Sequence, residues 1–64
     1  MRYMATYEED TVIMPLMDGV RDAGGDGLYL ANEDNALYFW TEDGEVPKVV
    51  EKLPGVLEVI MVAD

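Results

Sequence analysis

The chain has 64 residues, so it can form only one small domain, because a chain of this length buries only about 60% of the surface that it exposes when unfolded. Fourteen acidic and four basic residues give it a net charge of -10, which excludes direct binding to nucleic acid or to an anionic membrane. It contains no cysteine, histidine, serine or glutamine, and it therefore lacks disulfides, thiolate and imidazole metal ligands and the usual catalytic nucleophiles.

Half of the residues are hydrophobic, which predicts a folded domain rather than an acidic disordered tail. No hydrophobic run approaches the roughly 18 residues that a membrane span needs, and residues 1–4 lack the features of a signal peptide. General acid–base catalysis needs a carboxyl group in a pocket, and so short a chain leaves little room for one of the usual size, about 300–1,000 Å³. We therefore expect a cytoplasmic protein that is not an enzyme and binds no cofactor.

The beginning of the chain predicts a strand and then a helix. Residues 3–7 are rich in aromatic and β-branched side chains and end at the acidic triplet 8–10, which is typical of a strand that enters a turn. Over residues 11–23, hydrophobic side chains recur at the spacing of one helix face, at Ile13, Leu16, Met17 and Val20. Pro15 is compatible with the first turn of this helix, and Gly24-Gly25 predicts its end.

The start of this helix has an alternative interpretation. In it, residues 11–14 form a second strand that pairs with the first across the acidic turn, and a shorter helix begins at Pro15. We prefer the longer helix.

The middle of the chain carries the clearest hairpin pattern. Two hydrophobic runs, residues 28–31 and 36–41, flank the polar residues 32–35. Two sets of side chains alternate along these runs: Tyr29, Tyr38 and Trp40 in one set, and Leu28, Leu30, Leu37 and Phe39 in the other. Alternate side chains of a strand point to opposite faces, so we expect one set under the helices and the other on the uncovered face of the sheet.

A short helix and a hydrophobic strand are predicted at the end of the chain. Residues 46–53 have valine or leucine at helical spacing, and Pro54-Gly55 predicts the end of this helix. The strand over residues 56–63 is almost entirely hydrophobic, which usually indicates a central position in a sheet. Alternation predicts that its side chains face the helices at Leu57, Val59 and Met61 and the other side at Val56, Glu58, Ile60 and Val62.

The element order is therefore β-α-β-β-α-β over a single domain, residues 1–64. Right-handed crossovers place the strands in a four-stranded antiparallel sheet with both helices on one face. This predicts an α+β fold, a ferredoxin-like sandwich. The alternative start of the chain adds an N-terminal hairpin and gives the order ββ-α-ββ-α-β.

A partial calcium-loop motif covers residues 22–33. Asp22, Asp26, Gly27 and Glu33 match the first, fifth, sixth and twelfth positions of an EF-hand loop. The third position is Gly24, which has no side-chain ligand, and a strand rather than a helix follows the loop. The motif is thus a weak calcium candidate, and a glycine-rich turn in an acidic chain explains it equally simply.

Acidic loops and aromatic rings are the residues that we expect to bind a partner. The acids are Glu8, Glu9, Asp10, Glu33, Asp34, Glu42 and Asp43, and the rings are Tyr29, Tyr38 and Trp40. Rings that stack on RNA bases are surrounded by Lys and Arg, whereas these rings have acidic neighbours, which favours a protein partner with a basic surface. If the acids imitate the phosphates of a nucleic acid, the clusters 8–10, 33–34 and 42–45 should converge at the loop ends of the sheet.

Two resemblances extend this interpretation. A short, acidic, cysteine-free chain resembles in its composition the small inhibitors that phages make against host defence, including anti-CRISPR proteins and other DNA mimics. The segment 49–59, VVEKLPGVLEV, is similar to the last helix and strand of subtilisin propeptides. Those propeptides cap a protease with their open sheet face and insert a C-terminal tail, which we do not expect here because the sequence ends at Asp64, directly after the predicted strand.

The sequence therefore predicts an acidic inhibitor that binds the basic surface of a nucleic-acid-binding host protein, in the host cytoplasm if a phage encodes it. The first alternative is a homodimeric or halophilic structural domain, in which the open sheet face is buried against a second copy. The second alternative is a protease inhibitor of the subtilisin-propeptide kind.

Overall fold

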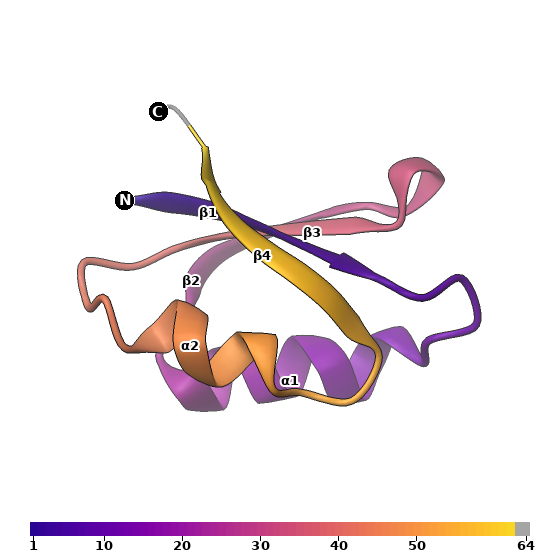
Figure 1. Ribbon diagram of the computed structural model, residues 1–64, viewed down its shortest axis with the longest axis horizontal. Helices are drawn as coiled ribbons and strands as arrows, with labels where there is room; N and C mark the ends of the chain where they lie inside the picture. The colour runs from indigo at the N-terminus through magenta and orange to yellow at the C-terminus, as the bar shows by residue number, and fades with distance from the viewer. Residues whose placement is uncertain (63–64) are drawn as a thin grey trace.

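The computed structural model describes residues 1–62, which form one antiparallel sheet and a layer of helices (Figure 1). In chain order, the elements are β1 (Arg2–Tyr7), α1 (Ile13–Ala23), β2 (Asp26–Ala31), the short 3₁₀ helix η1 (Asn32–Asp34), β3 (Ala36–Trp40), α2 (Val46–Glu51) and β4 (Val56–Val62). The predicted α+β class, the four-stranded antiparallel sheet and the pair of helices are confirmed. Ala63, the predicted last residue of the final strand, lies outside the described residues.

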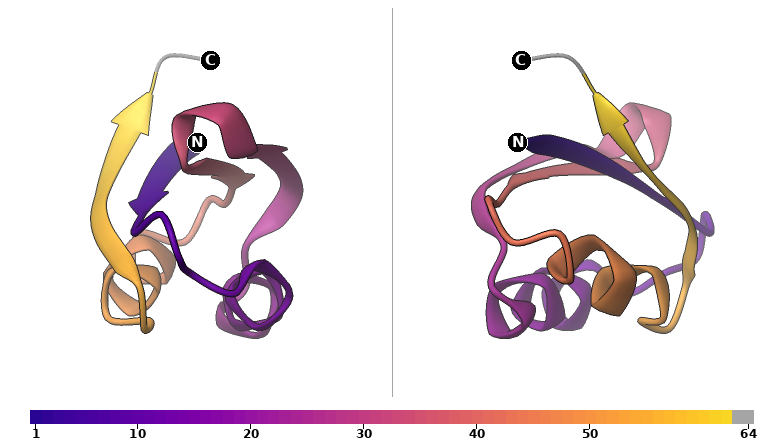
Figure 2. Two further views of the ribbon diagram at one scale, coloured as in Figure 1. Left: turned by 90° about the vertical axis from the view of Figure 1, so that its right-hand side faces the viewer. Right: turned by 60° about the vertical axis from the view of Figure 1, so that its left-hand side comes forward.

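The strands lie in the order β2-β3-β1-β4, and each neighbouring pair is antiparallel. Both helices cover the same face of the sheet (Figure 2). The central strands are β1 and β3, so the expectation that the last strand is central is wrong. The hydrophobic character of β4 does not reflect burial on both faces, because Leu57 is 62% exposed and Met61 is 59% exposed.

Helix α1 begins at Ile13, which rules out a second strand over residues 11–14. Val12 has an extended backbone and serves as the N-cap of the helix. Pro15 lies in the first turn, where its missing N–H removes no hydrogen bond. The helix ends at Gly24 as predicted, since the left-handed conformation of this residue, with φ of 112°, is one that glycine adopts without strain.

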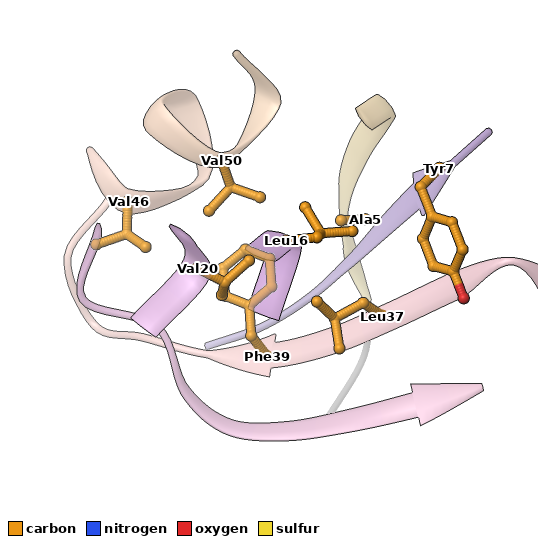
Figure 3. Close-up of a cluster of buried hydrophobic side chains, with 8 residues drawn as sticks. All are labelled: Ala5, Tyr7, Leu16, Val20, Leu37, Phe39, Val46 and Val50. Atoms are coloured by element: carbon orange, nitrogen blue, oxygen red, sulfur yellow. The ribbon is translucent and has the colours of Figure 1, made fainter. Parts of the chain in front are cut away.

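The core lies between the sheet and the two helices (Figure 3). Its buried side chains come in pairs from four elements: Ala5 and Tyr7 from β1, Leu16 and Val20 from α1, Leu37 and Phe39 from β3, and Val46 and Val50 from α2. The hydroxyl of Tyr7 donates a hydrogen bond of 3.0 Å to Oδ1 of Asn32. Burial raises the pKa of the Tyr7 phenol above its ordinary value.

A bulge in β4 sets which of its side chains reach the core. Thr6 lies opposite Glu58 and Tyr7 lies opposite Val56, so Leu57 is an extra residue in β4. One extra residue in a strand reverses the alternation of side chains beyond it.

The bulge explains why the predicted facing of β4 is only partly correct. Leu57 is exposed and Val56 packs against the core, so the prediction is wrong for both. Val59 packs against the core as predicted. Met61 lies opposite Tyr3, a partly buried neighbour of the core, but remains largely exposed because no strand lies beyond β4. Beyond the bulge, the residues on the other face are those predicted: Glu58, Ile60 and Val62.

None of the helices within residues 1–62 is long and apolar enough to cross a membrane.

Candidate functional site

The sheet face opposite the helices is not covered by another described element (Figure 2). The strand registers align a row of four large side chains across this face: Tyr29, Tyr38, Met4 and Ile60, one from each strand. A neighbouring row consists of Trp40, Arg2 and Val62. We call these seven residues the open face. The two sets of hairpin side chains lie on opposite faces, as their alternation predicts, and the helix-covered set is Leu28, Leu30, Leu37 and Phe39.

Two rings of the open face, Tyr29 and Trp40, are exposed, and the half-buried Tyr38 contacts Tyr29 and Arg2. Tyr29 is 61% exposed and Trp40 is 40% exposed. The ring centroids of Tyr29 and Tyr38 are 6.2 Å apart at an angle of 47°, and the guanidinium of Arg2 lies 5.3 Å from the Tyr38 centroid. A cation over a ring face and two tilted rings hold each other in place, so the open face presents preformed aromatic surface.

The acidic loops lie at two opposite ends of the sheet. Residues 8–10 follow β1, and Glu33 and Asp34 lie in η1. A hydrogen bond of 3.0 Å from the Tyr7 N–H to the Asn35 carbonyl joins these two segments. We call Glu8, Glu9, Asp10, Glu33 and Asp34 the first acidic end.

The third acidic cluster lies at the other end of the strands. Thr41, directly after β3, donates its N–H to the carbonyl of Met1 at 2.9 Å, so Glu42, Asp43 and Glu45 lie near the start of β1. We call these three acids the second acidic end. The two ends are separated by the length of a strand, which is about 17–20 Å at roughly 3.4 Å per residue. The expected convergence of all three clusters is therefore wrong, because β1 and β3 are antiparallel and present their following loops at opposite ends.

Asp43 also has a structural role that the sequence analysis missed. Its Oδ1 accepts a hydrogen bond of 2.9 Å from the Glu45 N–H, and its own N–H donates to Oγ1 of Thr41 at 3.0 Å. These bonds shape the loop that leads into α2. The signal in the sequence is an aspartate shortly before a helix, a position where this residue type commonly satisfies free backbone N–H groups.

The structure does not bring the calcium candidates together. Asp22 lies near the end of α1, Asp26 begins β2, and Glu33 follows the far end of the same strand. In the part of the chain that the structure describes, no three acidic side chains form a group that could hold a metal ion. The calcium-loop interpretation is thus wrong, because residues 26–31 are an extended strand instead of a loop that folds around an ion.

A surface pocket of about 310 Å³ lies at the first acidic end, between the segment before α1 and the segment before β4. Hydrophobic residues form most of its wall: Val12, Pro15, Leu16, Leu53 and Pro54. Glu8, Asp10, Thr11 and Gly55 complete the lining. The sequence analysis missed this pocket because its two walls are about 40 residues apart in the chain and meet only through the β1–β4 pairing.

The chain matches no known family model, and neither the curated proteins nor the solved structures contain a significant match to it.

Proposed function

We propose that this protein is a non-enzymatic inhibitor that binds a basic surface of a nucleic-acid-binding protein in the cytoplasm. The observation that carries the proposal is the open face, on which Tyr29, Trp40 and Ile60 are exposed, with acidic loops at both ends of its strands. Protein interfaces commonly combine an apolar centre with a charged rim, and tyrosine and tryptophan contribute strongly to their binding energy. The matching partner surface has an apolar centre and Lys or Arg at two flanking positions.

We infer the class of partner from the ligand that a basic surface with an apolar centre normally binds. Proteins that hold single-stranded nucleic acid combine a basic groove for phosphates with aromatic side chains on which bases stack. On this chain, the carboxylates stand in for the phosphates, and Tyr29, Tyr38 and Trp40 stand in for the bases. The acids form two separated groups instead of one row, which favours the imitation of a short single strand with exposed bases over that of a duplex backbone.

The charge of the molecule supports the same class of partner. A net charge of -10 on 64 residues attracts a basic protein and accelerates its association, especially at low ionic strength. It also repels nucleic acid itself, so the chain competes with nucleic acid for the partner and does not bind it. Among the small inhibitors that the composition resembles, this mode of action is that of the DNA mimics.

We also assign the fold to the ferredoxin-like class. The assignment is supported by the strand order β2-β3-β1-β4, by the two helices on one face and by the hairpin that joins β2 and β3. In this arrangement the uncovered face is always the one opposite the helices, where Tyr38 and Trp40 lie.

The test is a competition experiment. Proteins cross-linked to the chain in a host lysate are identified by mass spectrometry, purified and bound to a labelled single-stranded oligonucleotide. We expect the chain to displace the oligonucleotide, and we expect Trp40→Ala to weaken that displacement at least tenfold, because a tryptophan that anchors an interface contributes about 2 kcal/mol or more. Val49→Ala, an exposed change on α2, is the matched control and should have no effect. A partner that binds the chain and the oligonucleotide simultaneously would contradict the proposal.

Self-association is a second candidate, and the exposed edge of β4 favours it. This strand lies at the edge of the sheet and contains neither proline nor lysine, the residues that commonly prevent edge-to-edge pairing. Leu57, Ile60 and Met61 are exposed along it, and Glu58 is its only charged residue. Antiparallel pairing of two β4 strands would extend the sheet to a second copy.

A further inference from the structure

We propose that the pocket at the first acidic end binds the side chain of a lysine or arginine from the partner protein. The inference rests on the proposed function, in which the partner surface is basic, and it names a second contact outside the open face. The pocket combines hydrophobic walls with two carboxylates, Glu8 and Asp10. A lysine or arginine side chain has the matching form, because it carries a cationic group at the end of a hydrocarbon chain.

The two walls of the pocket are held together by a short backbone hydrogen bond. The Glu8 N–H donates to the Gly55 carbonyl at 2.9 Å and joins the two walls, while the bond of 3.0 Å from the Thr11 N–H to the Glu8 carbonyl closes a turn within one wall. Gly55 has φ of +89°, and a Cβ at this residue would lie 2.6 Å from Oγ1 of Thr11. Thr11 therefore packs directly on a glycine that no other residue can easily replace, which fixes the floor of the pocket.

The hydrophobic wall fits the hydrocarbon part of such a side chain. Leu16 is buried and closes the inner side, while Val12 is 70% exposed and forms part of the rim. Leu53 and Pro54 form the opposite wall. When the methylene groups of a lysine or arginine contact these residues, apolar surface of both the ligand and the pocket is removed from water, which favours binding.

The polar part of the lining selects a cation. Glu8 and Asp10 contribute two negative charges, whereas the positive end of the α1 dipole contributes only about half an elementary charge of the opposite sign. An ammonium or guanidinium group brings several N–H donors, which are what carboxylates accept.

The test uses N-acetyl-lysine N-methylamide as the probe and nuclear magnetic resonance titration of the intact chain at low salt. We expect backbone shifts at residues 8–12 and 53–55 and binding at least fivefold tighter than that of the norleucine analogue, which has the hydrocarbon chain without the ammonium. The double variant E8Q/D10N should weaken binding of the lysine probe at least fivefold. The control E42Q/D43N removes the same charge at the second acidic end and should change the affinity less than twofold.

Two results would overturn the proposal: equal binding of the norleucine analogue, or equal loss of affinity in the two double variants. The first would show a purely hydrophobic pocket, and the second a general attraction of cations to an acidic protein. Because the probe does not touch the open face, failure here leaves the displacement experiment intact. If the lysine probe binds the pocket as expected but the chain fails to displace the oligonucleotide, only the proposed function is contradicted.

Discussion

Thr11 is the residue whose polar group is least satisfied in this structure. Its hydroxyl oxygen is buried, has no hydrogen-bond partner among residues 1–62 and packs against Gly55. Burial of an unpaired hydroxyl costs about 1–3 kcal/mol. The sequence gives no sign of this, since Thr11 and Gly55 are 44 positions apart and the contact exists only once β1 and β4 pair.

We expect Thr11→Val to raise the free energy of unfolding by about 1 kcal/mol, because valine keeps the shape of threonine and removes the unpaired hydroxyl. Denaturant unfolding of the two proteins measures this. Gly55→Ala is the control with the opposite expected effect. It should lower the free energy of unfolding, because residue 55 has a positive φ and a Cβ there would collide with Thr11. A destabilised Thr11→Val protein would show that the hydroxyl has a partner in solution.

Tyr7 couples stability to alkaline pH. Burial raises the pKa of its phenol in the folded state above the ordinary value of 10.0, so the folded state retains the proton at a pH where the unfolded state has lost it. The stabilisation is fully present below pH 10 and decreases as the pH rises through the folded-state pKa. Tyr7→Phe lacks the ionisable group, so its unfolding free energy should fall less steeply above pH 10 than that of the unchanged chain.

Unfolding curves at a series of pH values compare the two proteins. The phenylalanine variant also loses the hydrogen bond to Asn32, so it should be less stable at neutral pH by about 1 kcal/mol. Parallel pH profiles above pH 10 would contradict the role of Tyr7.

At the scale of elements, local sequence patterns predict the strands and helices. The order of the strands in the sheet and the bulge in β4 depend instead on pairing between distant segments. The spacing of Leu16 and Val20, the glycine at position 24 and the alternation along the hairpin each report a property of one segment, and each is found as predicted. The position of β4 at the edge and the bulge at Leu57 depend on the partner strand β1. For that reason, the apolar character of residues 56–62 was a poor guide to their burial.

Some features of the candidate site could likewise be predicted from local sequence, and others could not. The exposure of Tyr29 and Trp40 on one face follows from the two-residue period of the hairpin and could be predicted. The separation of Glu42 and Asp43 from the other acids could not, because it depends on which ends of the strands adjoin. The pocket next to Glu8 has no local sequence signal, since distant segments form its two walls.

The edge strand β4 provides a test of self-association that leaves the open face unchanged. Met61 is largely exposed and lies on the helix-covered side of the sheet, opposite Tyr3. If β4 pairs with a second copy, sedimentation velocity should show a dimer that high salt favours by screening the repulsion between two acidic chains. Met61→Lys should then shift the equilibrium to monomer, because a lysine on an edge strand opposes pairing. A monomer at low and high salt would rule this candidate out.

At the scale of the whole molecule, the chain combines mostly acidic loops with an apolar face that a small domain cannot bury alone, although Lys48 lies 3.5 Å from Glu45 of the second acidic end. The sheet has one layer of helices, and the open face remains in contact with water. Three of the four basic residues, Arg21, Lys48 and Lys52, belong to the helix layer or directly follow it. Arg2, the fourth, lies on Tyr38. The open face thus carries one basic residue, Arg2, beside its exposed aromatic surface.

The most direct test is the affinity of the purified partner for the unchanged chain, for Trp40→Ala and for Val49→Ala, each measured at low and high salt. We expect Trp40→Ala to lose at least tenfold in affinity at both salt concentrations and Val49→Ala to bind like the unchanged chain, with all three weakening as salt rises. Equal affinities for the two variants, or binding that salt does not weaken, would show that the partner does not dock on the open face between the acidic ends.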